Sequence, residues 1–99
     1  MSDPRRIPGT DDVLARRLDV RVRNVGGVLV VARRVRQLQL SDVAAEVWQL
    51  LDGTRTVGEI VDRLATDYDA PPDEVREGVV ELLEQLVAER FVDVRRSGR

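Results

Sequence analysis

Cysteine, histidine and lysine are absent from the 99 residues of this chain, and aromatic residues make up only 3% of it. Without Cys and His, the chain has no disulfide, no thiol nucleophile, no imidazole base and none of the usual zinc or iron ligands. This excludes most enzyme classes, and we expect no catalytic residue, no metal site and no cofactor. Because aromatic residues are so few, we expect a core built mainly from Val, Leu and Ile.

Long hydrophobic runs are also missing. No apolar run approaches the roughly 20 residues that cross a bilayer, and Met1–Asp12 is polar, without the hydrophobic segment of a signal peptide. We therefore expect a cytoplasmic protein without membrane contacts. The length suits one small domain with a single core.

All sixteen basic residues are Arg, and eighteen acidic residues bring the net charge to −2. The two signs are separated along the chain. Residues 1–40 hold nine Arg and four Asp, a balance of +5, whereas residues 41–99 hold seven Arg and fourteen acidic residues, a balance of −7. GC-rich codon usage accounts for the preference for Arg, but not for the separation of charge along the chain.

Residues 1–16 are interpreted as a flexible N-terminal tail, because they begin with a polar stretch containing Pro4, Pro8 and Gly9. Ordered structure is expected to begin near Arg17. One domain is predicted over residues 17–92, followed by a C-terminal tail over residues 93–99.

Three strands are predicted from period-two alternation and branched residues: Leu18–Arg23, Val28–Ala32 and Val35–Leu40. In the first strand, Leu18, Val20 and Val22 would share the buried face. The Asn24–Gly27 segment suits a hairpin turn. The second strand is apolar on both faces and is expected to be central, so the third strand would be an open edge.

Three helices should follow, from an N-cap at Ser41 to Leu51, from Thr56 to Tyr68, and from Pro72 or Asp73 to about Arg90. Thr56 and Glu59 have the spacing of a capping box. Tyr68 is expected in the core with the apolar face of the second helix. A short extended segment, Phe91–Val94, is predicted to end the domain.

This order of elements predicts an α+β fold of winged helix-turn-helix type, a three-stranded antiparallel sheet followed by three α-helices. In DNA-binding members of that architecture the last helix is basic. Here residues 73–90 carry six acidic residues and only two Arg, and phosphates would be repelled. We therefore expect no binding to nucleic acid.

The third predicted helix has an unusually wide apolar sector. Its helical wheel places the residues expected to pack on the other helices in one narrow arc: Val75, Val79, Leu82 and Leu86. Val80, Leu83 and Val87 fall on a flank bordered by Arg76 and Arg90. That flank either packs beneath the sheet or forms one wall of a groove beside the third strand. A peptide in such a groove would add a strand to the open edge. Gly78 is costly within a helix, by about 0.5–1 kcal/mol relative to Ala, and close packing is the expected reason for it.

Several segments together resemble the PqqD-like proteins, recognition elements for ribosomally made and post-translationally modified peptides. The resemblance covers about residues 17–92 and is carried by four segments: Gly27–Val30, Val35–Leu40, Ala44–Val57 and Leu82–Leu86. Its most specific part is the Trp-x-x-Leu-x-Asp-Gly-x-Arg-Thr-Val run from Trp48 to Val57. A free-standing, Arg- and Val-rich chain of this length is most similar to the stand-alone leader-binding proteins of lasso-peptide biosynthesis.

The resemblance implies that the leader segment of a precursor peptide is added to the third strand and held against the third helix. The candidate peptide-binding residues are Arg34, Val35, Arg36, Gln37, Leu38, Gln39, Arg76, Val79, Val80, Leu83, Glu84 and Val87. The implied partners are the leader peptide and a leader peptidase, with a cyclase or another modifying enzyme.

Three alternatives stay open at this point. The chain could be a peptide chaperone of pyrroloquinoline-quinone type that serves a radical-SAM enzyme. It could be a winged-helix regulator that binds DNA, against which the acidic third helix counts. It could also be an enzyme that uses carboxylates, for which Asp52, Asp69 and Asp73 are available, although all three stand at predicted helix ends and suit capping or turn roles.

Overall fold

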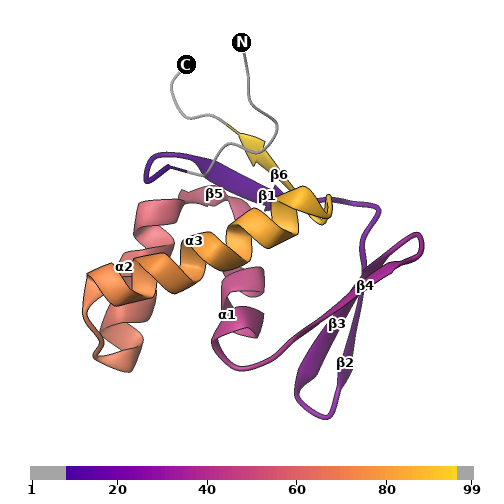
Figure 1. Ribbon diagram of the computed structural model, residues 1–99, viewed down its shortest axis with the longest axis horizontal. Helices are drawn as coiled ribbons and strands as arrows, with labels where there is room; N and C mark the ends of the chain where they lie inside the picture. The colour runs from indigo at the N-terminus through magenta and orange to yellow at the C-terminus, as the bar shows by residue number, and fades with distance from the viewer. Residues whose placement is uncertain (1–8, 96–99) are drawn as a thin grey trace.

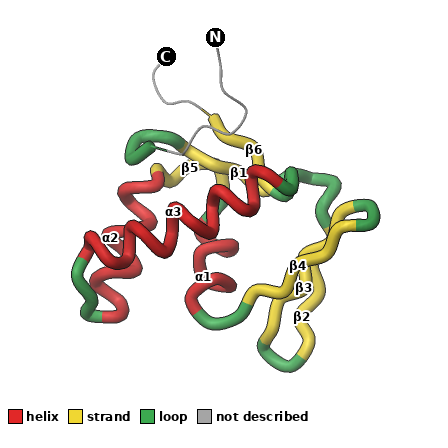
Figure 2. Tube along the Cα trace, viewed as in Figure 1, coloured by secondary structure: helices red, strands yellow, loops and turns green. Residues whose placement is uncertain are grey.

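The structure is a computed structural model that describes residues 9–95 (Figure 1). Its elements in chain order are β1 (Val13–Arg16), β2 (Arg21–Val25), β3 (Val28–Arg33), β4 (Arg36–Leu40), α1 (Val43–Leu50), β5 (Asp52–Thr56), α2 (Val57–Tyr68), α3 (Pro72–Ala88) and β6 (Val92–Arg95). One small antiparallel sheet (β1, β5, β6) lies above the three helices and the other (β2, β3, β4) lies to the right of α1, with α3 crossing in front of α2 (Figures 1 and 2). The α+β class and the three predicted helices are confirmed.

Sheet B is the sheet that the sequence predicted, with strand order β2-β3-β4. The central strand β3 pairs antiparallel with both neighbours, from Val25↔Val28 to Arg21↔Ala32 on one side and from Arg33↔Arg36 to Leu29↔Leu40 on the other. Gly26 and Gly27 take positive φ in the first hairpin turn, as the Asn24–Gly27 segment predicted. The first strand begins later than expected, at Arg21. Leu18 lies fully exposed in the preceding loop and Val22 is also exposed, so the predicted buried face of this strand is wrong.

Sheet A combines strands from the start, middle and end of the chain, in the order β5-β1-β6. β1 pairs with β6 from Val13↔Arg95 to Arg16↔Val92, and with β5 at Val13↔Thr56 and Ala15↔Asp52. The expectation that order begins near Arg17 is therefore wrong, and so is the assignment of residues 93–95 to a tail. The remainder of the two predicted tails, residues 1–8 and 96–99, lies outside the described residues.

The helix boundaries follow the predicted caps with two exceptions. Thr56 and Glu59 form the predicted capping box, since the Glu59 N–H donates to Thr56 Oγ1 at 3.1 Å and the Thr56 N–H donates to Glu59 Oε1 at 2.8 Å. Ser41 is not the N-cap of α1. Asp42 holds that position with a φ of 54° and no side-chain cap hydrogen bond. α3 starts at Pro72 as predicted and ends at Ala88, two residues early, because Arg90 adopts a left-handed conformation.

The core is mainly aliphatic, with Trp48 and Phe91 as its aromatic residues, and it joins both sheets and the three helices. Its largest fully buried side chains come from both sheets, the three helices and the connection after α3: Leu14, Val31, Leu40, Val47, Leu51, Val57, Ile60, Val61, Leu64, Leu83, Leu86 and Phe91. Tyr68, predicted to be buried, is 49% exposed. No helix among residues 9–95 is long and apolar enough to cross a membrane.

Asp19 connects the two sheets across the loop between β1 and β2. Its carboxylate accepts hydrogen bonds from Arg17 and from Arg33 of β3, each at 3.0 Å, and Arg17 also donates to Asp93 of β6 at 3.2 Å. The hydrogen bond from Arg17, followed by that from Arg33 and the charges of both, lowers the pKa of Asp19 to about 2. Asp19 is therefore ionised at neutral pH and pairs with Arg17 in the loop after β1 and with Arg33 of β3.

Candidate functional site

Sheet B has two outer edges among the described residues, β2 and β4, and β4 is the one that leads directly into the helices. β3 pairs with one side of β4, and no strand within residues 9–95 pairs with the other. In an antiparallel ladder alternate residues direct their N–H and C=O groups away from the paired neighbour. β4, the third strand predicted from the sequence, is thus an open edge as predicted, and another chain can pair with it.

The predicted site residues on this strand lie along that edge. Arg34 and Val35 form the two-residue turn before β4, Arg34 with a φ of 57° and Val35 almost fully exposed. Gln37 and Gln39 are exposed on one face. Leu38, half-buried, and Leu40, buried, share the opposite face, which is the inner one. Side chains alternate along a strand, so Arg36 lies on the inner face with Leu38, at the end of the strand nearest the turn.

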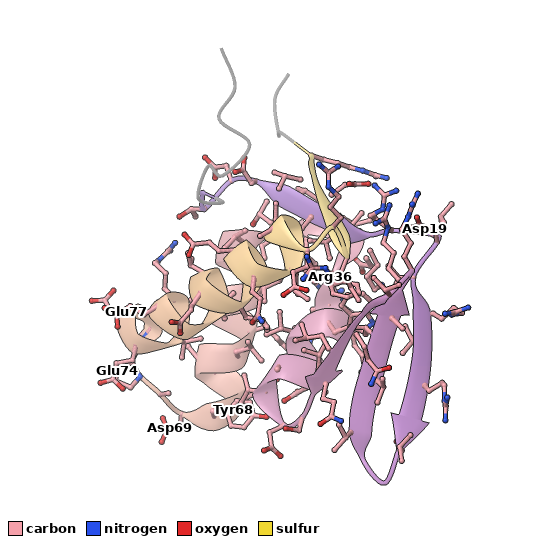
Figure 3. The ribbon with its side chains drawn as sticks, turned by 45° about the vertical axis from the view of Figure 1, so that its right-hand side comes forward. Asp19, Arg36, Tyr68, Asp69, Glu74 and Glu77 are labelled. Atoms are coloured by element: carbon pink, nitrogen blue, oxygen red, sulfur yellow. The ribbon has the colours of Figure 1, made fainter. Side chains whose placement is uncertain are left out.

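One flank of α3 faces β4 and α1. Residues three and four apart share a helix face, so Val75, Gly78, Leu82 and Glu89 lie along the same side. The first three line a pocket against α1, and Glu89 Oε1 lies 3.7 Å from Arg36 Nη1 of β4. Figure 3 shows Arg36 beside the C-terminal end of α3. These contacts fix which side of the helix meets the strand.

The opposite flank of α3 carries four of the residues that were predicted to line the groove: Arg76, Val80, Glu84 and Val87. Arg76 Nη1 donates to Thr10 Oγ1 at 2.7 Å, in the segment before β1. Arg76, Val80 and Glu84 line a shallow outer surface of α3, and Val87 is half-buried on the same flank. The prediction that this flank faces the third strand is wrong. The helix is rotated about its axis from the expected orientation, because Leu83 and not Leu82 points at the centre of the core.

Leu83 and Leu82 exchange the roles that the sequence analysis gave them. Leu83 is 0% exposed and packs in the core, so it offers no surface to a peptide. Leu82 is half-buried and lines the pocket beside α1. Val79, another predicted contact residue, is 2% exposed and lies at the floor of the same pocket.

An open apolar pocket lies where the three helices meet, next to the end of β4. Its volume is about 480 Å³, and we call it the helical pocket: Val43, Ala44 and Val47 of α1, Leu64 and Tyr68 of α2, Ala70, and Glu74, Val75, Gly78, Val79 and Leu82 of α3. Only two residues connect Leu40 at the end of β4 to Val43 at the start of α1. The open edge of β4 and the helical pocket therefore adjoin along the chain.

Glu74 lines the helical pocket, and further acidic side chains lie beside its Tyr68. The Tyr68 hydroxyl donates a hydrogen bond to Glu46 Oε1. Tyr68 and Glu74, both labelled in Figure 3, line the pocket. The hydrogen bond to Glu46, together with burial and the charges of Glu46, Asp42 and Asp67, raises the pKa of Tyr68. The site is thus negative at the helical pocket, whereas the start of β4 is basic, with Arg34 in the preceding turn and Arg36 in the strand.

Comparison with known proteins places this arrangement in a family. Residues 26–92 match the family model described as Coenzyme PQQ synthesis protein D (PqqD). The chain belongs to the PqqD family. The resemblance that the sequence predicted is thereby confirmed.

Relatives within the PqqD family carry the name PqqA binding protein. The one from Bradyrhizobium diazoefficiens is 31% identical over 100 residues, 98% of this chain and 97% of that protein. The one from Rhodopseudomonas palustris (strain BisB5) is 39% identical over 68 residues, 69% of this chain and 67% of that protein.

Solved structures agree with the PqqD assignment. The solution structure of the PqqD part of Methylobacterium extorquens PqqCD, described as a recognition element for ribosomally made peptides, has a TM-score of 0.76 at 29% identity and covers 91% of this chain and 97% of that one. TbiB1 in complex with the TbiA(beta) leader peptide has a TM-score of 0.71 over 80% of this chain and 94% of that one. At 18% identity this second similarity concerns the fold alone.

The helical pocket was missed by sequence reasoning, although a signal for it exists. The apolar sector of α3 is too wide for a surface helix, which indicated a second apolar contact besides the core. The sequence analysis placed that contact on the wrong flank. Val43 and Tyr68 could not be recognised as pocket residues from the sequence, because the sequence pattern does not distinguish an exposed apolar residue at a helix end from a core residue.

Proposed function

We propose that this PqqD-family protein binds the leader segment of a ribosomally synthesised precursor peptide by strand addition to β4, beside α3. The protein has no catalytic role in this proposal. It holds the precursor and delivers it to an enzyme that modifies or cleaves it, such as a leader peptidase or a cyclase. The observation that carries the proposal is the unpaired edge of β4 next to the apolar helical pocket.

The open edge and the pocket supply the two components of strand-addition recognition. Backbone pairing along Arg36–Leu40 gives affinity without sequence preference, and a pocket for individual side chains gives specificity. The predicted contact residues of β4 and its turn keep their role in this proposal. On α3 the contacts move to the flank of Leu82 and Glu89, away from Arg76, Val80, Glu84 and Val87.

The names of the relatives support a peptide ligand. The PqqA binding protein of Bradyrhizobium diazoefficiens matches 98% of this chain at 31% identity, and the structural neighbour TbiB1 was solved with a leader peptide. Transfer of peptide binding to this chain is consistent with the fold and with the surface described above.

Two pathways are compatible with a leader-binding role. Maturation of a lasso peptide, with a leader peptidase and a cyclase as partners, is the pathway implied by the resemblance to stand-alone leader-binding proteins. A chaperone of pyrroloquinoline-quinone type, serving a radical-SAM enzyme, is the second candidate and is favoured by the names of the relatives. The genes beside this one would separate the two.

Catalysis by carboxylates is disfavoured by the local roles of the candidate residues. Asp52 accepts hydrogen bonds from the Thr54 hydroxyl at 2.7 Å and from the Arg55 guanidinium at 2.7 Å. The hydrogen bonds from Thr54 lower the pKa of Asp52, so it is a poor proton donor at neutral pH. Asp69 is the left-handed C-cap of α2, and Asp73 lies in the first turn of α3.

DNA binding would require the acidic outer face of α3 to approach phosphates. We propose that the helices and sheet B keep a winged helix-turn-helix arrangement in which α3 no longer reads DNA. Glu74, Glu77, Glu81 and Glu84 all line the outer surface of α3. An electrophoretic shift with random duplex at low salt would revive the DNA-binding alternative.

Titration calorimetry tests the proposed function. Three synthetic peptides serve as ligands: PqqA, the TbiA(beta) leader, and the leader of any small precursor encoded beside the gene. Micromolar or tighter binding of one of them is expected. Absence of binding to all three, with the protein shown to be folded, would remove the support for a leader-binding role.

A further inference from the structure

Gly78 has no structural reason to be glycine. It lies in the interior of α3, does not take a positive φ, and a Cβ built on it meets no heavy atom within 4 Å. Close packing, the reason expected from the sequence, is therefore excluded. Glycine is less favourable than alanine in a helix interior. Ala at this position would therefore make the fold more stable.

Gly78 lies at the border between the helical pocket and the outer surface of α3, and it lines both. Gly78 lines the pocket together with Val75 and Leu82 of the same flank, and it is exposed. The wall opposite, in α1, begins with Val43, which is 40% exposed. A large side chain at position 78 can reach the opening between these two walls, because Gly78 lines the helical pocket.

We propose that Gly78 keeps this opening clear for one large apolar side chain of the bound peptide, and that a Lys or Arg of the same peptide lies beside that side chain. The inference rests on the proposed function and specifies what the peptide must contain. Gly78 acts as a specificity-determining residue, because the size of the residue at this position limits what enters the pocket.

The apolar part of this motif follows from the pocket, and the basic part follows from its rim. Val43, Ala44, Val47, Leu64, Val75 and Leu82 give the pocket an apolar lining, which favours an apolar side chain over a polar one. Glu74 lines the pocket, Glu46 accepts a hydrogen bond from Tyr68 of its lining, and Asp42 and Asp67 add negative charge near Tyr68. A peptide carrying only acidic residues there would be repelled.

The peptide that fills the pocket is the one paired with β4, because the two sites adjoin. A five-residue strand such as β4 spans about 17 Å, and the linker of two residues brings the pocket next to its end. A peptide that leaves the edge at Leu40 reaches the pocket within a few residues. One extended segment can therefore use both sites.

Thermal unfolding provides the first test. Gly78→Ala should raise the melting temperature by about 2 to 8 °C, since Ala favours the helix and its Cβ meets nothing. An unchanged or lower melting temperature would show that the fold itself requires glycine here, and would overturn the proposal.

Selection of random twelve-residue peptides displayed on phage provides the second test. Wild-type protein should enrich peptides with a large apolar residue next to Lys or Arg. Gly78→Leu should reduce the binding of those peptides about tenfold or more, as expected when one apolar side chain loses its pocket. Glu77→Leu, which places the same side chain on the outer face, is the matched control and should leave binding unchanged.

The possible results separate the two levels of inference. If wild-type protein enriches no peptide, the proposed function fails. If it enriches peptides that lack the apolar and basic pair, or that bind Gly78→Leu as tightly as wild type, the peptide-binding role stands and the assignment of Gly78 is wrong.

Discussion

Aspartate substitutions at Leu82 and Leu83 distinguish the binding surface from the core at adjacent positions. Leu83 is 0% exposed, whereas Leu82 is half-buried and lines the helical pocket. We expect Leu83→Asp to unfold the protein and Leu82→Asp to leave it folded but unable to bind a peptide. The sequence pattern alone led to the opposite assignment.

The magnitudes follow from burial. Removing a buried Leu side chain costs about 2–5 kcal/mol, and an unpaired carboxylate in the core adds several kcal/mol. The total approaches the whole stability of a domain of this size, about 5–15 kcal/mol. At Leu82 the carboxylate stays in contact with water, so the expected loss is about 1–2 kcal/mol.

Circular dichroism melts measure the two stabilities, and fluorescence anisotropy with a labelled peptide that wild-type protein binds measures the binding. Leu82→Met, which preserves volume and apolarity, is the control and should bind within a few-fold of wild type. A folded Leu83→Asp variant with a normal melting temperature, or an unfolded Leu82→Asp variant, would show that α3 is not oriented as described.

Two further predictions concern the segments before β1 and β2. Gly58→Ala should destabilise the protein by about 1–3 kcal/mol in urea unfolding, because the added Cβ would lie 2.7 Å from Thr10 Cγ2. Thr10→Ser removes that methyl group, so the double mutant should recover part of the lost stability. If the effects of the two substitutions are simply additive, the contact is not the cause of the loss. Asp19 has its pKa lowered to about 2, first by the hydrogen bond from Arg17 and then by Arg33, so its contribution to stability is present above its ordinary pKa of 3.8 and is lost as the pH falls towards 2. Asp19→Asn should flatten the pH dependence of the unfolding free energy between pH 4 and 2, and an unchanged slope would contradict this role.

The parts of the fold that could be predicted are those set by local patterns. The β3 strand follows from a branched apolar run, and α2 from a capping box that the structure contains. Sheet A could not be predicted in this way. β5 is Asp-Gly-Thr-Arg-Thr, without an apolar residue, and β1 has only four residues. Both strands form because β1 pairs with β5 on one side and with β6 on the other. These pairs join distant parts of the chain, which a local sequence pattern does not predict.

The candidate site was predictable on the strand and not on the helix. In β4, side chains alternate between the two faces, so burial of one face fixes which residues point inwards. The sequence therefore predicted both this strand and its position at the edge of the sheet correctly. A helical wheel gives only relative angles. With seven apolar residues spread over about 160° of α3, several orientations bury a similar area, and only the packing of Leu83 in the core decides between them.

The most direct measurement for the central claim is amide hydrogen exchange of residues 36–40, followed by NMR with and without a bound peptide. Strand addition to β4 predicts that the outward-facing amides of this strand exchange much more slowly in the complex, with smaller effects at Val75, Gly78 and Leu82. Unchanged exchange along β4, with new protection on β2 or on the outer face of α3, would show that the peptide binds elsewhere.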